Sequence, residues 1–193
     1  MRRLRLPFGF ARAALALIAA PILCAGAEPA LPPDQPAPGA PRLLASADLG
    51  SELRALIGPT TVIFVRDRQF IVIDHAWLVE AFLPHFRRFL TSLGPQTGLT
   101  EGLDCDNYAD LLRTQLVIAN LRGGGHRWGD VACAVVQAYT QHPFGDVPAT
   151  KVLHALIALR TSQGWFVIEP QNTTLSPLSE YPNLESTLIA SLE

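Results

Sequence analysis

Apolar residues recur at helical spacing in the first half of the folded region and at strand spacing in the second half. Apolar positions three and four residues apart predict helices over residues 48–57, over 75–93, and from Cys105 to the glycines at 123–125. Pro84 is expected to kink or divide the second helix. Runs rich in β-branched and aromatic residues predict strands at residues 61–65, 69–74, 131–139, 151–160 and 165–169.

The order of these elements predicts an α+β domain with helices packed on an antiparallel sheet. The first two strands flank a charged turn and are expected to pair as a hairpin over residues 61–74. The last two strands are expected to pair around a turn at 161–164. In that register His154 and Glu169 are diagonal neighbours on one face, whereas a three-residue loop would place them on opposite faces.

The first 27 residues have the pattern of a secretory signal peptide. Arg2, Arg3 and Arg5 form a basic start, and an apolar run of 12 residues follows at 13–24, which is too short for a typical membrane span. Small residues predict cleavage near Ala27. A lipoprotein would instead use Cys24, but bulky Leu23 disfavours that alternative. The mature protein is therefore expected to be periplasmic or secreted.

Residues 28–43 contain six prolines and are expected to form an extended linker. Residues 44–193 are then a single domain, long enough to bury a core. The whole chain has 15 basic and 17 acidic residues. The signal peptide contains four of the arginines and no acid, so the mature chain has 11 basic and 17 acidic residues. This acidic balance excludes nucleic acid as a partner, and no stable membrane span is expected in the mature chain.

Two cysteines remain after cleavage, and they suggest different roles. Cys105 opens an amphipathic helix, where the helix dipole and unpaired N–H groups favour the thiolate. Cys133 alternates with apolar residues and is expected to be a buried strand residue. Because an exported protein meets an oxidising compartment, a structural disulfide between Cys105 and Cys133 is an open alternative.

The order of Cys105, His154 and Glu169 along the chain suits a thiol-dependent site. Glu169 can accept a hydrogen bond from one imidazole nitrogen of His154, which leaves the other nitrogen for the thiol proton. A histidine on an apolar strand is by itself more often a core residue. The acid on the same face and the cysteine at a helix start favour the catalytic interpretation.

Two segments resemble the motifs of a known superfamily. Residues 104–112 (Asp-Cys-Asp-Asn-Tyr-Ala-Asp-Leu-Leu) resemble the cysteine-helix motif of the transglutaminase-like superfamily, and residues 154–170 resemble its His–turn–Asp-Pro motif. The likeness is greatest to the bacterial transglutaminase-like cysteine proteinases, which are periplasmic. It implies a papain-like fold and thiol acyl transfer, with Cys105 as nucleophile, His154 as base and Glu169 as orienting acid. Glu169 stands where the family usually has aspartate.

Two further assignments complete the predicted site. Gln96 is the first candidate for an oxyanion donor and Gln69 the second, beside the backbone N–H of Cys105. Asp104 and Asp106 are expected to cap the helix. Because some related periplasmic proteinases use calcium, these two aspartates are also a candidate calcium site. Beyond this candidate calcium, no cofactor is expected.

The sequence therefore predicts an exported cysteine hydrolase, a peptidase that acts on a protein or peptide substrate. If an amine replaced water as the acceptor, the same chemistry would make the protein a transglutaminase-type acyl transferase. A non-catalytic envelope protein on the same fold, with the two cysteines bridged, is the other alternative.

Overall fold

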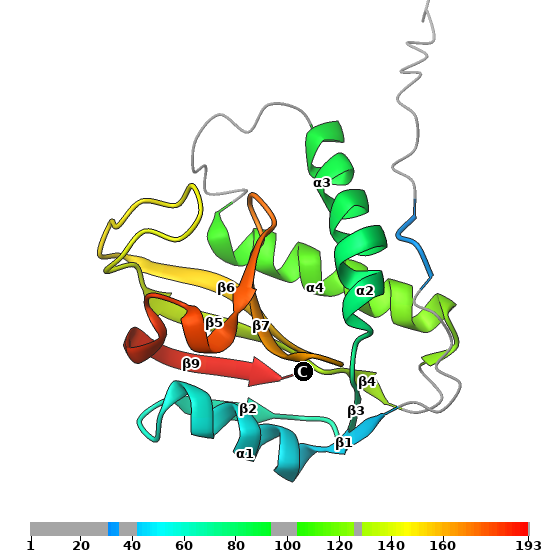
Figure 1. The fold of residues 1–193 in the computed structure, drawn as a ribbon, viewed down its shortest axis with the longest axis horizontal. Helices are drawn as coiled ribbons and strands as arrows, with labels where there is room; N and C mark the ends of the chain where they lie inside the picture. The colour runs from blue at the N-terminus through cyan, green and yellow to red at the C-terminus, as the bar shows by residue number, and fades with distance from the viewer. Residues whose placement is uncertain (1–30, 35–41, 94–103, 126–128, 193) are drawn as a thin grey trace, which may run out of the picture.

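The computed structural model describes residues 31–34, 42–93, 104–125 and 129–192. Within these ranges six strands form a central sheet in the order β2-β9-β5-β6-β7-β8 (Figure 1). In chain order these are β2 (Val62–Val65), β5 (Cys133–Tyr139), β6 (Leu153–Thr161), β7 (Gly164–Glu169), β8 (Thr174–Pro177) and β9 (Thr187–Leu192). A smaller described sheet contains β1 (Leu43–Ala45), β3 (Gln69–Ile71) and β4 (Asp130–Val131).

The helices agree closely with the apolar spacing of the sequence. They are α1 (Ser46–Ile57), α2 (His75–Trp77), α3 (Leu83–Ser92) and α4 (Cys105–Arg122). A π-helical turn at Leu78–Phe82 joins α2 to α3, and Pro84 lies in the first turn of α3, directly after this irregular turn. The predicted helix over 75–93 is thus confirmed as three consecutive helical segments.

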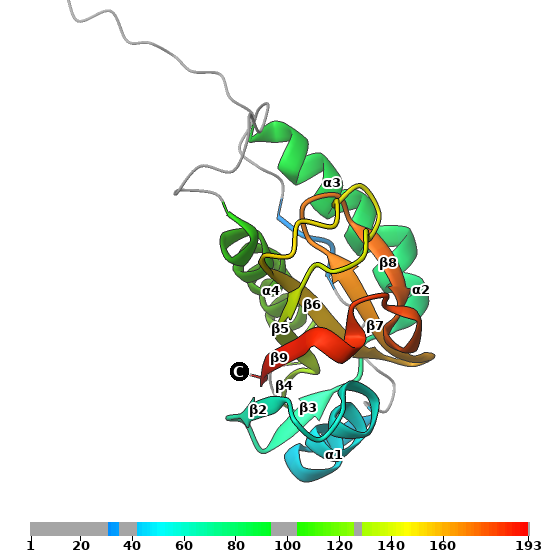
Figure 2. The ribbon, with the colours of Figure 1, turned by 90° about the vertical axis from the view of Figure 1, so that its left-hand side faces the viewer.

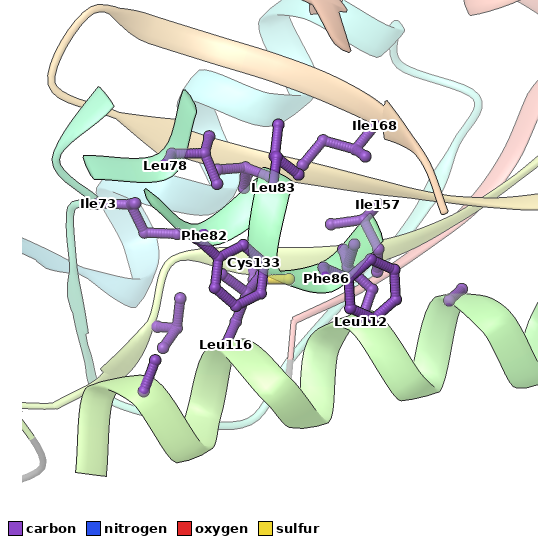
Figure 3. Close-up of a cluster of buried hydrophobic side chains, with 14 of the residues drawn as sticks. Ile73, Leu78, Phe82, Leu83, Phe86, Leu112, Leu116, Cys133, Ile157 and Ile168 are labelled. Carbon is purple, nitrogen blue, oxygen red and sulfur yellow. The ribbon is translucent and has the colours of Figure 1, made fainter. Parts of the chain in front are cut away.

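Apolar cores lie on both faces of the central sheet. Figure 3 shows one core, in which side chains of α4 and α3 meet the sheet, and a second core lies under α1 and residues 178–184. Strand β6 contributes Ile157 and Leu159 to the first core and Leu156 and Ala158 to the second. Because both of its faces are buried, this strand is a continuous apolar run and does not alternate.

The predicted hairpin over residues 61–74 is wrong. Strand β2 pairs in parallel with β9, so that Val62 faces Ile189, whereas β3 pairs with β1 and β4 in the smaller sheet. The central sheet is consequently mixed and not purely antiparallel. The two segments are short apolar strands without a glycine-containing turn between them, so local sequence does not oblige them to pair.

The proline-rich segment before the domain has a contact with it. Pro32 is buried, and its carbonyl accepts a hydrogen bond of 3.1 Å from Arg122 Nη1 at the end of α4. Asp34 forms an ion pair with the same arginine at 2.9 Å. The two contacts dock residues 31–34 against the domain. Among the described residues, no helix has both the length and the apolar character needed to cross a membrane.

Candidate active site

Cys105 is the first residue of α4, and the residues around it fix where that helix begins. The Asp104 carboxylate accepts a hydrogen bond of 3.4 Å from the N–H of Asn107, and the Asn107 side chain accepts one of 3.3 Å from the N–H of Asp104. This reciprocal capping box satisfies N–H groups that a helix start would otherwise leave unpaired. The thiol of Cys105 is therefore presented, partly exposed, at the positive end of an 18-residue helix.

The candidate calcium ligands interact with each other. A hydrogen bond between the two side chains lowers the pKa of Asp104 and raises that of Asp106. Among the residues that the structure describes, no group of three or more His, Cys, Asp or Glu side chains is arranged to hold a metal ion. The geometry thus assigns Asp104 to capping, and calcium binding by this pair stays a prediction.

His154 and Glu169 meet across the β6–β7 hairpin in the predicted register. Arg160 faces Trp165 and Ile157 faces Ile168, so the turn has the length that puts His154 and Glu169 on one face. His154 Nε2 donates to Glu169 Oε2 over 2.6 Å. Glu169 is wholly buried and His154 is 8% exposed. The second carboxylate oxygen of Glu169 accepts the N–H of Gln171 at 3.0 Å, so both oxygens have partners.

The His154 ring also contacts the thiol of Cys105. A hydrogen bond with His154 lowers the pKa of Cys105; the Ala155 N–H and the imidazolium charge act in the same direction, against burial and the charge of Asp106. For His154, burial opposes protonation, but hydrogen bonds and charges from Cys105 and Glu169 outweigh it and raise the pKa to about 9. These opposite shifts favour a thiolate–imidazolium pair near neutral pH.

The end of the β6–β7 ladder gives the thiol access to strand β6. Counting back from the pair Ile157–Ile168, Ala155 would face Pro170. The paired residues of this ladder end at Ile157 and Ile168, before this position. The backbone N–H of Ala155 is close enough to Cys105 to help lower the pKa of its thiol. The sequence alone gave no sign of this contact, because it depends on where α4 packs.

Cys133 is separate from this site. Both cysteines are free thiols, and Cys133 is 1% exposed in the core drawn in Figure 3, where burial raises its pKa to about 12. Cys133 faces Leu159, whereas Cys105 contacts Ala155, four residues away along β6. At about 3.3 Å per residue this separates the two positions by about 13 Å, beyond the reach of a disulfide. The bridged alternative is therefore contradicted.

The two candidate oxyanion donors have different outcomes. Gln96 lies outside the described residues. Gln69 is on β3 and lines a broad hollow together with Val117 and Asn120 of α4. Val117 is twelve residues from Cys105, about 18 Å along the helix axis. Gln69 is therefore at the other end of α4 and the assignment of an oxyanion donor there is wrong.

Two exposed apolar side chains beside the site were missed by the sequence reasoning. Tyr139 and Leu153 are cross-strand partners on β5 and β6, and each is 42% exposed. Leu153 has the same parity along β6 as Ala155, so this pair lies on the face of the sheet that α4 covers. The sequence could have indicated them, because Tyr139 is the last residue of one predicted strand and Leu153 lies near the start of the next, beside the intervening loop.

The described helices and strands form an α+β fold with a papain-like resemblance to PSL1a. Solved structures of similar fold include a complex of PSL1a with E64, at a TM-score of 0.52 and 13% identity. Another is Polyporus squamosus lectin bound to a human-type influenza-binding epitope, at a TM-score of 0.50 and 14% identity. Each alignment covers 78% of this chain, which spans about half the length of the matched chains (50% and 49%). The sequence matches no protein-family model and no curated protein.

Proposed function

We propose that this protein is a cysteine hydrolase that cleaves amide bonds in peptides by thiol acyl transfer. The observation that supports it is the position of the His154 ring, bonded to buried Glu169 on one side and to the Cys105 thiol on the other. Imidazole has two ring nitrogens, and Nε2 is occupied by Glu169, so Nδ1 is left for the sulfur. The resemblance of residues 104–112 and 154–170 to the motifs of transglutaminase-like cysteine proteinases also supports this proposal.

In the first half-reaction the Cys105 thiolate attacks the carbonyl carbon and forms a C–S bond. The carbonyl oxygen takes the negative charge, for which the Cys105 backbone N–H at the helix start is one donor. Protonated His154 then gives its proton to the leaving amine as the C–N bond breaks. A thioester and neutral imidazole remain, and Glu169 keeps the ring in position.

In the second half-reaction neutral His154 accepts a proton from water while the water oxygen attacks the thioester. A C–O bond forms, the C–S bond breaks, and the thiolate–imidazolium pair is restored as the acid leaves. A primary amine in place of water would give amide transfer. The chemistry of the triad is the same for both acceptors, so the product measured in the presence of an amine distinguishes them.

Two observations favour a peptide as substrate. The exposed pair Tyr139 and Leu153, at the end of β6 where His154 lies, offers an apolar surface on the face that α4 covers and suits the side chain of a peptide residue. The matched structure of PSL1a contains E64, an inhibitor of papain-like cysteine proteases.

Export through an N-terminal signal peptide, and hence a periplasmic or secreted location, stays part of the proposal.

Covalent labelling tests the proposal directly. The mature chain is incubated with E64 and, separately, with iodoacetamide near neutral pH, and modified residues are located by mass spectrometry. Modification at Cys105, lost in Cys105→Ala and kept in the matched variant Cys133→Ala, is the expected result. Cleavage of a peptide library should depend on the same residue. Equal labelling of both cysteines, or cleavage that survives Cys105→Ala, would contradict the proposal.

A further inference from the structure

The turn between β7 and β8 contains a backbone conformation that its residue type disfavours. Thr173 has φ of 62°, in the left-handed region that β-branched residues rarely adopt. Thr173 is buried, and the turn follows directly after Glu169. Strain of this kind persists only where surrounding contacts compensate for it, and it is concentrated at functional sites. The contacts of Thr173 therefore indicate what the turn does.

Arg87 of α3 provides the compensating contact. Its Nε and Nη2 atoms both donate to Thr173 Oγ1, over 2.9 Å and 2.6 Å. The hydroxyl in turn donates to the Asn172 carbonyl at 2.6 Å, so its hydrogen-bonding capacity is fully used. Figures 1 and 2 show α3 beside the turn that leads from β7 into β8. A forked, charge-assisted contact of this kind fixes the turn against the helix.

The fixed turn also determines the position of Glu169. The Thr173 N–H donates to the Glu169 carbonyl at 2.8 Å, and the N–H of Gln171, in the middle of the turn, donates to Glu169 Oε1. The other carboxylate oxygen is then directed at His154. If the turn moved, Glu169 would lose the N–H that selects its side-chain conformation.

We propose that Arg87 is a positioning residue for the triad, which acts through Thr173 and the turn to fix Glu169 against His154. The inference rests on the proposed function, because it assigns the arginine to the same site. Arg87 is exposed and contacts neither Cys105 nor His154 in the bonds described, so its effect is transmitted by the backbone of residues 169–173.

The expected consequence is a change in the ionisation of Cys105. When Glu169 is less well positioned, imidazolium is less stabilised, and the pKa of Cys105 rises toward that of an ordinary thiol. The other ionisable groups that act on this pair are Asp106, whose charge raises the pKa of Cys105, and Tyr181, which lies near Glu169. Neither belongs to the turn, so their influence remains the same in the variants below.

The test is the pH profile of iodoacetamide alkylation at Cys105, measured on the mature chain by mass spectrometry. In Arg87→Ala the profile should move up by about half to one pH unit, so that alkylation at a fixed pH below the midpoint slows about three- to tenfold. Arg88→Ala, the adjacent exposed arginine of α3, is the matched control and should keep the wild-type profile. Arg87→Lys keeps the charge without the fork and should give an intermediate shift.

Variants of Thr173 separate positioning from a general loss of stability. Thr173→Val keeps the shape of the side chain but removes the hydroxyl, and it should shift the alkylation profile as far as Arg87→Ala does. Thr173→Ser keeps the hydroxyl and should therefore keep the wild-type profile. Combined with Arg87→Ala, Thr173→Val should add nothing further, because both remove one contact. Thermal unfolding of each variant checks that the comparison is made on folded protein.

The outcomes distinguish the two proposals. An ordinary thiol profile for Cys105 in the wild-type chain would contradict the proposed function itself. An activated wild-type profile that Arg87→Ala leaves unchanged, or that Arg88→Ala shifts equally, would overturn the positioning role and leave the function standing.

Discussion

His154 and Glu169 lie on neighbouring strands, and their side chains join at 2.6 Å where both are almost completely removed from water. Burying a carboxylate is costly unless it is paired and hydrogen-bonded. Here Glu169 has an imidazole on one oxygen and a backbone N–H on the other. These contacts hold the pair in one arrangement. The other ring nitrogen of His154, Nδ1, is left for the thiol of Cys105.

Replacing the acid should affect the reaction more than the fold. In Glu169→Gln the amide removes the charge that raises the pKa of His154, and kcat for peptide cleavage should fall by roughly two orders of magnitude. Glu169→Asp keeps the charge but shortens the side chain by one methylene, so an intermediate loss is expected. Steady-state kinetics and circular dichroism measure the two effects. Full activity in Glu169→Gln would show that the carboxylate charge is not required.

The pH dependence of cleavage should have an upper limit set by His154. Its pKa is raised to about 9, so the imidazolium that protonates the leaving amine is lost as pH rises through that value. The same raised pKa links His154 to stability. Its contribution to the free energy of unfolding is fully present below the ordinary histidine pKa of about 6.5 and is lost as the pH rises through about 9. On the acid side, cleavage should fall as Cys105 is protonated, below the pKa of an ordinary thiol. Initial rates and unfolding free energies of the wild type and His154→Gln between pH 5 and 10 check both limits.

Cys133 should contribute to the stability of the fold and not to the reactivity of Cys105. Its side chain is in the apolar core, and Cys133→Ala is expected to lower the free energy of unfolding by about 1–2 kcal/mol without changing alkylation at Cys105. A thiol count on the mature protein should give one reactive cysteine when native and two in urea. Two unreactive cysteines and a cross-linked peptide would restore the disulfide alternative.

The two aspartates at the start of α4 should have separable effects. Asp104→Ala removes the cap and should lower the melting temperature of the protein. Asp106→Asn removes a charge that raises the pKa of Cys105, so alkylation should begin at lower pH. Asp110→Asn, on the exposed surface of the same helix, serves as the comparison and should leave both quantities unchanged. Adding a calcium chelator during these measurements tests the predicted calcium site.

Local pattern was enough to predict the elements around the site. The capped start of α4, the β6–β7 hairpin and its register all depend on residues close together in the chain, such as Asp104 with Asn107 and Arg160 with Trp165. These interactions need no distant partner. The resemblance of the two motifs to a superfamily added the roles expected of Cys105, His154 and Glu169.

Local sequence pattern does not predict pairing between segments that are far apart in the chain. Strands β8 and β9 in the C-terminal residues were not predicted, and β2 was predicted to pair with β3, although β2 lies beside β9. Gln69 was the second candidate for the oxyanion donor, but separation in sequence does not predict position in space, and Gln69 lies at the far end of α4. Short apolar strands are compatible with several neighbours, and the packing of the whole domain selects among them.

The sequence by itself determined a helix that begins at Cys105 and a hairpin between the strands of His154 and Glu169, because a local cap and the alternation of side chains specify both. The turn length, which the sequence left open, was decided by the structure and places the two residues on one face. Only the tertiary structure decided that the thiol of Cys105 meets the His154 ring and the Ala155 N–H, and that Cys133 is buried elsewhere. It also brought Arg87 to Thr173 across 86 residues of chain. The physical reason is that these contacts depend on how α3 and α4 pack on the sheet, and many distant apolar side chains determine that packing together.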